Sequence, residues 1–225
     1  MKLHAHPAST ASRPVMMFCA HDRIKIDNVT VDLFSGEHMK EPFLGLNPNG
    51  LVPVLEDDGF VLSESSAILK YLADKTNSAC YPKELKARAR VNELMDWFNT
   101  QMYREIGYHL VYPQVFPAHK RMTDEMTQSI IDWGLDKTRG WLEILDKKIL
   151  GHGKTYLTGD RITIADFFGA EIIACADLIR CDFSRYPNVT RWLGAMKALP
   201  HWTDVHQVID GFAASMKDKA FTAVA

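Results

Sequence analysis

Hydrophobic positions alternate with polar ones in the first part of the chain and follow a helical spacing further on. Residues 2–6 and 28–33 alternate and are expected to form strands, with a helix through residues 15–19 between them and a short, irregular helix over residues 36–43. Two more strands, residues 52–55 and 60–62, are expected to form a hairpin, because the Asp57-Asp58-Gly59 run that joins them has turn chemistry. Next, apolar residues from Ile68 to Leu72 fit a helix. The predicted order is β-α-β-α-β-β-α.

From Leu85 onward every segment has a helical pattern and no strand signal returns. One helix is expected over residues 85–103, and another through residues 141–149 ends at Gly151. Thr163 and Asp166 have the spacing of a capping box, before a helix so apolar that we expect it at the centre of this half. A last amphipathic helix, residues 189–196, should end before Pro200. The second half is therefore predicted to be all-helical.

The stretch between the halves loses its periodicity and carries Asn77, Ser78 and Pro82, as a linker does. We therefore predict one domain over residues 1–76, a linker over 77–84 and a second domain over 85–225. The length of 225 residues, with 47% apolar and 24% charged residues, suits two globular domains.

Charge and hydropathy exclude several classes of partner. The formal net charge is -2 and no basic run is sustained, so we expect no nucleic-acid partner and no anionic-membrane surface. No apolar segment reaches the length of a membrane span, and the first residues lack a hydrophobic signal core. The expected location is the cytoplasm.

The cysteines and histidines give no metal motif. Cys19, Cys80, Cys175 and Cys181 lie far apart without a C-x-x-C pair, which disfavours a zinc site, a redox dithiol and a disulfide framework. His4 and His6, an H-x-H pair without an acidic or cysteine neighbour in the sequence, are interpreted as strand side chains. No metal is expected.

Two features of residues 47–72 suggest ligand binding. Pro53 cannot donate a ladder hydrogen bond, so it belongs at a strand start or edge, where the backbone of Val52 stays free to pair with an extended peptide. Glu64 and Ser65 open a predicted helix, whose unpaired amides and positive dipole end favour an anionic group. A plain N-cap would explain the serines here equally well.

The N-P-x-G-x-V-P-V-L run and the following Glu-Ser pair resemble the glutathione-binding half of the cytosolic glutathione transferases. The resemblance implies a thioredoxin-like domain with a mixed four-stranded sheet, a helical second domain, and a homodimeric detoxification enzyme that uses glutathione as co-substrate. It also implies that the Val52-Pro53 bond is cis, that the Val52 backbone pairs with the cysteinyl part of glutathione, and that Glu64 and Ser65 hold the γ-glutamyl end.

In that family one donor after the first strand keeps the glutathione thiol as a thiolate. No tyrosine precedes Tyr71, and Cys19 lies inside a predicted helix, so a hydroxyl remains. The run H-P-A-S-x-x-S-R-x-V resembles the theta class and related bacterial enzymes, including the dichloromethane dehalogenases, and places Ser9 as the catalytic serine. Thr10 and Ser12 stay as alternatives for contacting the sulfur, and a helix N-cap is an alternative role for Ser9.

The same resemblance puts His38 at a glutathione-contacting position and extends the glutathione site to Thr10. Two residues depart from the theta pattern: Thr10 stands where those enzymes have Gln, and Leu51 stands where a Lys is common. We expect the electrophile pocket across the domain cleft, on an aromatic helix that could equally be plain core. Its candidate residues are Tyr103, Arg104, Tyr108 and Tyr112.

The predicted function is glutathione transfer to a small halide, epoxide or activated aromatic. The alternative from another class is a non-catalytic glutathione-binding or structural protein with the same fold. A zeta-type isomerase fits less well, because Thr10 stands where the cysteine of its Ser-Ser-Cys run would be.

Overall fold

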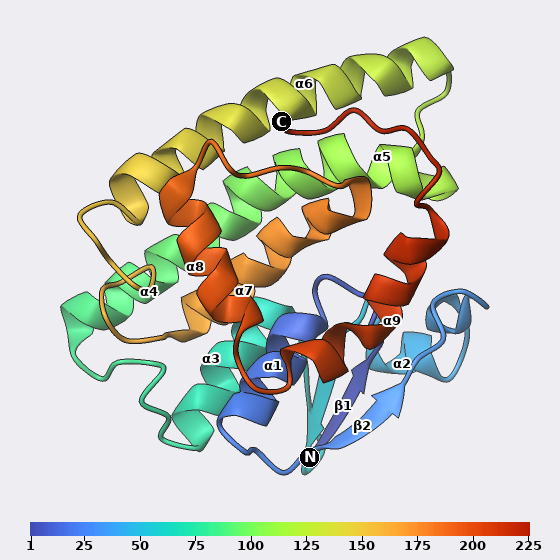
Figure 1. Cartoon of the computed structure of the whole chain (residues 1–225). Helices are drawn as coiled ribbons and strands as arrows, with labels where there is room; N and C mark the ends of the chain where they lie inside the picture. Colours follow the sequence, from blue (N-terminus) through green and yellow to red (C-terminus); the bar gives the residue numbers. More distant parts are fainter.

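The computed structural model describes residues 1–225, with a β-sheet layer at one end and a larger helical layer beside it (Figure 1). The mixed four-stranded sheet has the order β2-β1-β3-β4. Central β1 (Lys2–Ala5) pairs in parallel with β2 (Asp27–Thr30) and antiparallel with β3 (Val54–Asp57), and β3 pairs antiparallel with β4 (Phe60–Ser63). Leu3 lies opposite Leu55, and both side chains are fully buried. The predicted thioredoxin-like sheet is confirmed.

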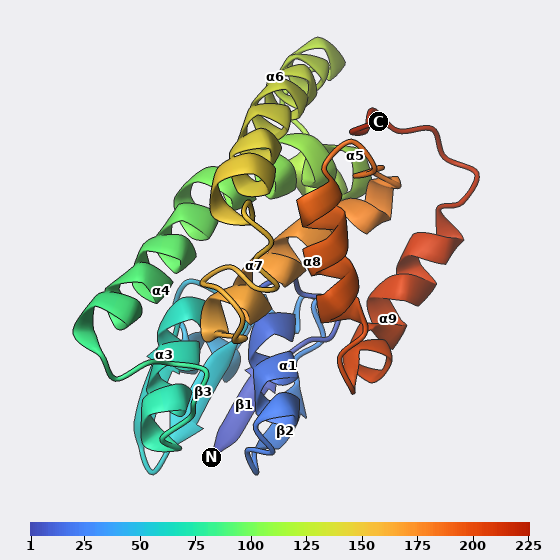
Figure 2. The same ribbon diagram turned by 60° about the vertical axis from the view of Figure 1, so that its left-hand side comes forward.

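Helices cover both faces of this sheet. On one face, α1 (Arg13–His21) and α3 (Ser65–Lys75) contact each other and also the central helix of the other layer (Figure 2). On the other face lie a 3₁₀ turn, η1 (Glu37–Met39), and α2 (Phe43–Leu46), next to a small separate core of Val31, Phe43, Val52 and Val54.

Several element bounds of the sheet layer differ from the sequence expectation. β2 ends at Thr30, before the predicted end at residue 33, because the Asp32 carboxylate accepts the amides of Phe34 and Ser35 and turns the chain away. β3 begins only at Val54, since Pro53 has no N–H to donate to a ladder. The helix predicted over residues 36–43 is two separate short turns, η1 and α2.

The hairpin turn lies where the sequence placed it. Asp58 and Gly59 have φ of 48° and 85°, both in the left-handed region. A two-residue loop with both φ values positive matches the twist of the flanking strands. Aspartate and glycine tolerate this conformation, which is why the Asp-Gly signal was informative.

The helical layer is built on one long run and its neighbour. α4 (Leu85–Trp97) continues into the π-helical η2 (Phe98–Val111) and α5 (Tyr112–Val115), so the run extends well beyond the predicted end at residue 103. After η3 (Pro117–His119), α6 (Asp124–Ile144) returns beside η2 and continues as η4 (Leu145–Ile149) (Figure 1). The sequence analysis had identified only the last part of α6.

The central helix of this layer is α7 (Ile164–Ala174), followed by the 3₁₀ segment η5 (Cys175–Ile179). Every residue of α7 is buried, as predicted. The capping box is also confirmed: the Asp166 carboxylate accepts the Thr163 amide and hydroxyl, each at 2.8 Å. It further accepts the Leu157 amide at 2.8 Å and the Trp192 indole N–H at 3.0 Å.

Two more helices close the fold, α8 (Pro187–Lys197) and α9 (Trp202–Ser215). α8 had been predicted and α9 had not. α9 packs beside α1 and so joins the two layers. The predicted linker, residues 77–84, falls between α3 and α4, while the domain division itself stays a prediction. None of the helices is both long and apolar enough to cross a membrane.

Candidate active site

The loop between β1 and α1 carries Ser9, whose hydroxyl still has a proton to donate. The Ser9 Oγ accepts the Ser12 amide at 3.2 Å, and the Ser9 carbonyl accepts the amides of Ser12 and Arg13 at 3.1 Å each. A hydroxyl that accepts a hydrogen bond keeps its own O–H free. The alternative role of Ser9 as a helix N-cap is wrong, because Ser12 is the N-cap residue of α1 and Ser9 lies before it. The Ser9 hydroxyl can donate into the space in front of α1.

The two alternative hydroxyls differ in position. Thr10 is buried and lines the same cavity as Ser9. Ser12 is fully buried, its Oγ accepts the His6 amide at 3.4 Å, and it does not line the cavity. Of the three candidates, only Ser9 and Thr10 face the space that a ligand could fill.

This cavity has a volume of about 610 Å³ and takes its walls from both layers. With the exception of the alternative Ser12, it brings together the residues proposed from the sequence for the site: Ser9, Thr10, His38, Val52, Pro53, Glu64, Ser65, Tyr103, Arg104, Tyr108 and Tyr112. The first seven belong to the sheet layer, and the last four come from η2 and α5 across the cleft.

One wall is the turn that leads into β3. The Val52-Pro53 peptide is cis. Asn47, missed by the sequence analysis, donates from Nδ2 to the Leu51 carbonyl at 2.7 Å and so holds the turn in front of Val52. Gly50 has φ of 62°, and a Cβ there would lie 2.7 Å from the Met39 sulfur. The Asn and Gly of the N-P-x-G motif are therefore the residues that this turn conformation requires.

A second wall is the start of α3. Glu64 precedes the helix with φ of 67°, a conformation that costs a non-glycine residue roughly 1–3 kcal/mol. Ser65 is the first helical residue and is buried, and both residues line the cavity. Strain of this kind at a cavity wall is typical of functional sites. The free amides of the first helical turn face an anionic group favourably.

His38, on η1, contributes an unsatisfied polar atom. Its Nδ1 is buried and has no hydrogen-bond partner within the protein, and the residue lines the cavity. Buried polar atoms are nearly always paired, so an unpaired one at a cavity wall suits a ligand group.

Three tyrosines form the far wall. The hydroxyls of Tyr103 and Tyr112 are 2.8 Å apart, and the Tyr108 ring packs against both. Burial raises the pKa of Tyr103 and of Tyr112 well above the ordinary value; Tyr112 and Tyr108 raise that of Tyr103 further, and Cys175 raises that of Tyr112 further. Both therefore stay protonated at neutral pH. Since one hydroxyl donates to the other, one O–H of the pair remains available.

The apolar part of the cavity was largely missed from the sequence. Phe116 stacks on Phe212 of α9, with the ring centroids 5.8 Å apart. The Phe34 ring lies 6.2 Å from the Phe212 ring. Ile209 of α9 also lines the cavity. The spacing of Val205, Ile209 and Phe212 is that of a helical face and would have revealed α9.

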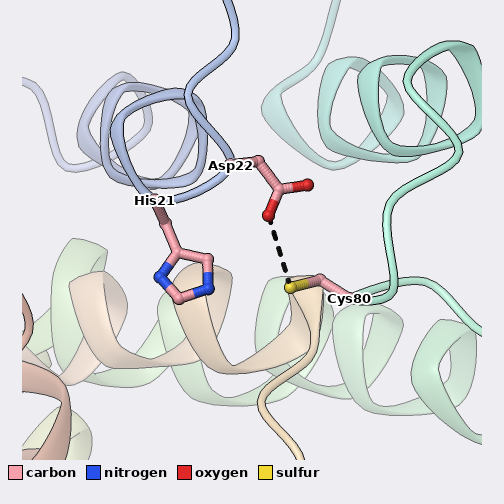
Figure 3. A group of neighbouring side chains, drawn as sticks. All are labelled: His21, Asp22 and Cys80. Atoms are coloured by element: carbon pink, nitrogen blue, oxygen red, sulfur yellow. Dashed lines mark hydrogen bonds between the residues drawn. The ribbon is translucent and has the colours of Figure 1, made fainter.

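Outside the cavity, one group of side chains gathers possible metal ligands (Figure 3). Ligand atoms of His21, Asp22 and Cys80 lie within 4.8 Å of one another, a grouping that the sequence separations did not predict. Burial, with Asp22 and other neighbours, raises the pKa of the Cys80 thiol to about 11. The Cys80 thiol lies 3.8 Å from the Asp22 carboxylate, and this contact joins the linker to the end of α1.

Comparison with known proteins gives consistent matches over most of the chain. Residues 8–75 match the model of the glutathione S-transferase N-terminal domain, and residues 111–200 match that of the C-terminal domain. Human glutathione S-transferase theta-2B is 32% identical over 201 residues, which cover 88% of this chain and 81% of that protein.

Solved structures agree with these sequence matches. A crystal structure of human glutathione transferase theta-2 in complex with glutathione has a TM-score of 0.86 and 28% identity, and the match covers 100% of this chain and 93% of that one. A delta-class glutathione transferase of Nilaparvata lugens has a TM-score of 0.78 and 29% identity, with 96% and 98% covered.

Proposed function

The chain belongs to the glutathione S-transferase family, and we propose that Ser9 is the residue that activates glutathione in this cavity. Glutathione is the co-substrate, and the reaction is its conjugation to an electrophile. A free thiol with a pKa of about 8.5 is mostly protonated at neutral pH, so a donor that stabilises the thiolate increases the concentration of nucleophile.

The observation that carries this proposal is the bonding of the Ser9 hydroxyl. Its oxygen accepts the Ser12 amide, so its proton is free, and the residue lies on the cavity wall. Accepting a hydrogen bond polarises the O–H and strengthens the one it donates. Thr10 also lies on the cavity wall and is the alternative donor. Substituting each residue in turn distinguishes the two.

The proposed contacts with the rest of glutathione follow the two walls of the sheet layer. The cysteinyl backbone pairs with the free backbone of Val52, which precedes the cis peptide to Pro53. Glu64 and Ser65 hold the γ-glutamyl end, the glutamate by its charge and the serine at the helix start. His38 offers its unpaired Nδ1 to the remaining part of the peptide.

The proposed electrophile site is the aromatic half of the cavity. Phe116, Phe212 and the tyrosines give a hydrophobic surface that suits a small apolar halide, epoxide or activated aromatic. The free O–H of the Tyr103–Tyr112 pair can donate to negative charge that develops on the electrophile. Arg104 stands at the exposed rim, where its Nε donates to Glu105 at 2.8 Å.

The homodimer is likewise proposed. Phe60 and Val61 on the edge strand β4 and Leu85 at the start of α4 are exposed hydrophobic residues. Arg90 and Glu93 add charges of both signs on the exposed side of α4, and these can pair across a two-fold axis.

The test of Ser9 is an ultraviolet titration of enzyme-bound glutathione together with turnover of an activated aromatic halide. We expect the wild-type protein to form the thiolate well below the pKa of the free thiol. Ser9→Ala should raise that pKa and lower transition-state stabilisation by on the order of 2–4 kcal/mol, the contribution of one preorganised donor.

Thr10→Val serves as the matched control, and we expect it to keep most of the activity. If Thr10→Val rather than Ser9→Ala abolishes thiolate formation, the donor is Thr10. Tight glutathione binding with an ordinary thiol pKa in the wild type would favour the non-catalytic binding protein, a reading consistent with Thr10 and Leu51 departing from the theta pattern.

A further inference from the structure

Three buried side chains connect the serine loop with two helices of the other layer. Arg13, at the start of α1, directs Nε to Oε2 of Glu171 on α7 at 2.7 Å, and both side chains are only 1% exposed. His206 of α9 places Nε2 3.0 Å from the same carboxylate oxygen. No role for any of the three follows from the sequence pattern.

The other edge of the Arg13 guanidinium holds the loop that presents Ser9. Its Nη1 donates to the Ala8 carbonyl at 3.1 Å and to the Pro7 carbonyl at 3.4 Å. These are the two residues directly before Ser9. Because a guanidinium is planar and its donors have a fixed geometry, anchoring one edge on Glu171 fixes where the other edge holds the loop.

His206 is itself held on both sides. Its Nδ1 lies 2.8 Å from the Trp202 carbonyl, and its ring stacks on the Trp202 ring at 3.8 Å. Both ring nitrogens thus lie within hydrogen-bond distance of oxygen atoms, so the ring is held on both sides. α9 also places Ile209 and Phe212 on the cavity wall, so the same helix contacts the network and the proposed electrophile site.

The carboxylate between these groups is charged. Burial alone raises the pKa of Glu171, but Arg13 and His206 outweigh it and hold the pKa below its usual range. A buried ion cluster contributes little net stability, because desolvation of its charges cancels much of their attraction. Stability therefore does not explain this arrangement well. The fixed position that Arg13 gives to the loop before Ser9 explains it better.

We propose that Glu171 is a positioning residue: through Arg13 it fixes the carbonyls of Pro7 and Ala8 and so aims the Ser9 hydroxyl at the glutathione sulfur. His206 supports the carboxylate from α9. The inference rests on the proposed role of Ser9, and it assigns the thiol pKa of the bound glutathione partly to a residue of the helical layer that does not touch the ligand.

The test uses Glu171→Gln, which keeps the shape and removes the charge. We expect the pKa of bound glutathione to rise by about one unit and kcat to fall roughly tenfold or more, because a small misplacement of a catalytic group is costly. The KM for glutathione should change little, since Val52, Glu64 and Ser65 are untouched. His206→Gln should shift the thiol pKa in the same direction by less, and it replaces Glu171→Gln if that variant does not fold.

Asp57→Asn is the matched control. The Asp57 carboxylate is also buried and accepts from Tyr71 at 2.6 Å and from Lys75, but it is not on the cavity wall. The Asp57→Asn variant should be less stable than the wild type, and the pKa of the glutathione thiol bound to it should be unchanged. If the wild type forms the thiolate at low pH and the network variants do so equally, the positioning role is wrong and the role of Ser9 stands. If the wild type has an ordinary thiol pKa, both proposals fail.

Discussion

The carboxylate of Glu171 shows how a single residue is tuned by its surroundings. Burial raises its pKa, but the interactions with Arg13 and His206 outweigh burial and lower it. Asp166, on the same helix, is surrounded by neutral donors, and burial there raises the pKa above its usual range. Two acidic residues on one helix therefore have opposite shifts, because only one of them faces positive charge.

At this scale the prediction concerns pH. A depressed pKa in the folded state means that Glu171 contributes stability above the unfolded pKa of about 4.3, and that this contribution is lost as the pH falls through the folded value. The difference in unfolding free energy between wild type and Glu171→Gln should be largest near neutral pH and shrink below about pH 4. Urea unfolding at several pH values measures it. A difference that stays constant down to acid pH would show that the Glu171 charge adds no stability.

The start of α7 is the element on which the helical layer depends. Asp166 accepts hydrogen bonds from the Thr163 amide and hydroxyl, from the Leu157 amide and from the Trp192 indole, all of them buried. It therefore joins the helix start to the preceding loop and to α8. It lies outside the cavity.

For this element we expect Asp166→Ala to lower the unfolding free energy by about 3 kcal/mol, because several buried donors lose their acceptor. Asp166→Asn should lose less, since an amide oxygen can still accept from Leu157 and Trp192. Kinetic constants per folded molecule should stay at the wild-type level. Guanidinium unfolding with active-site titration checks both, and a loss of turnover without a loss of stability would move Asp166 into the catalytic machinery.

For the whole molecule, the proposed dimer rests on the apolar residues that are exposed on β4 and at the start of α4. Leu85 is 79% exposed and Phe60 is 48% exposed. Exposed apolar residues that form a contiguous patch on a folded protein often mark an interface.

We therefore expect sedimentation at micromolar concentration to give a dimer of the 25.5 kDa chain. Leu85→Glu combined with Phe60→Lys should shift the equilibrium to the monomer, because charged residues are unfavourable at the centre of an interface. Met122→Glu, an exposed residue beside α6, serves as the control and should stay dimeric. A wild-type monomer that still binds glutathione would mean that each site is complete within one chain.

The sequence by itself determined the sheet layer, the helical nature of the second half and the local backbone features of the proposed site, whose roles the resemblance to the glutathione transferases implied. The reason is local: Pro53, Gly50, the Asp58-Gly59 turn and the Glu64-Ser65 helix start each depend on backbone conformation, which neighbouring residue types restrict strongly. Hydrophobic period then distinguished strands from helices.

Only the tertiary structure decided which distant groups meet. Arg13 and Glu171 are separated by 158 positions, and His206 comes from a helix that the pattern analysis missed. The same holds for Phe212 beside Phe34 and Phe116, and for Cys80 beside Asp22. Such contacts depend on how whole elements pack against one another, and the spacing along a single chain segment carries no information about that packing.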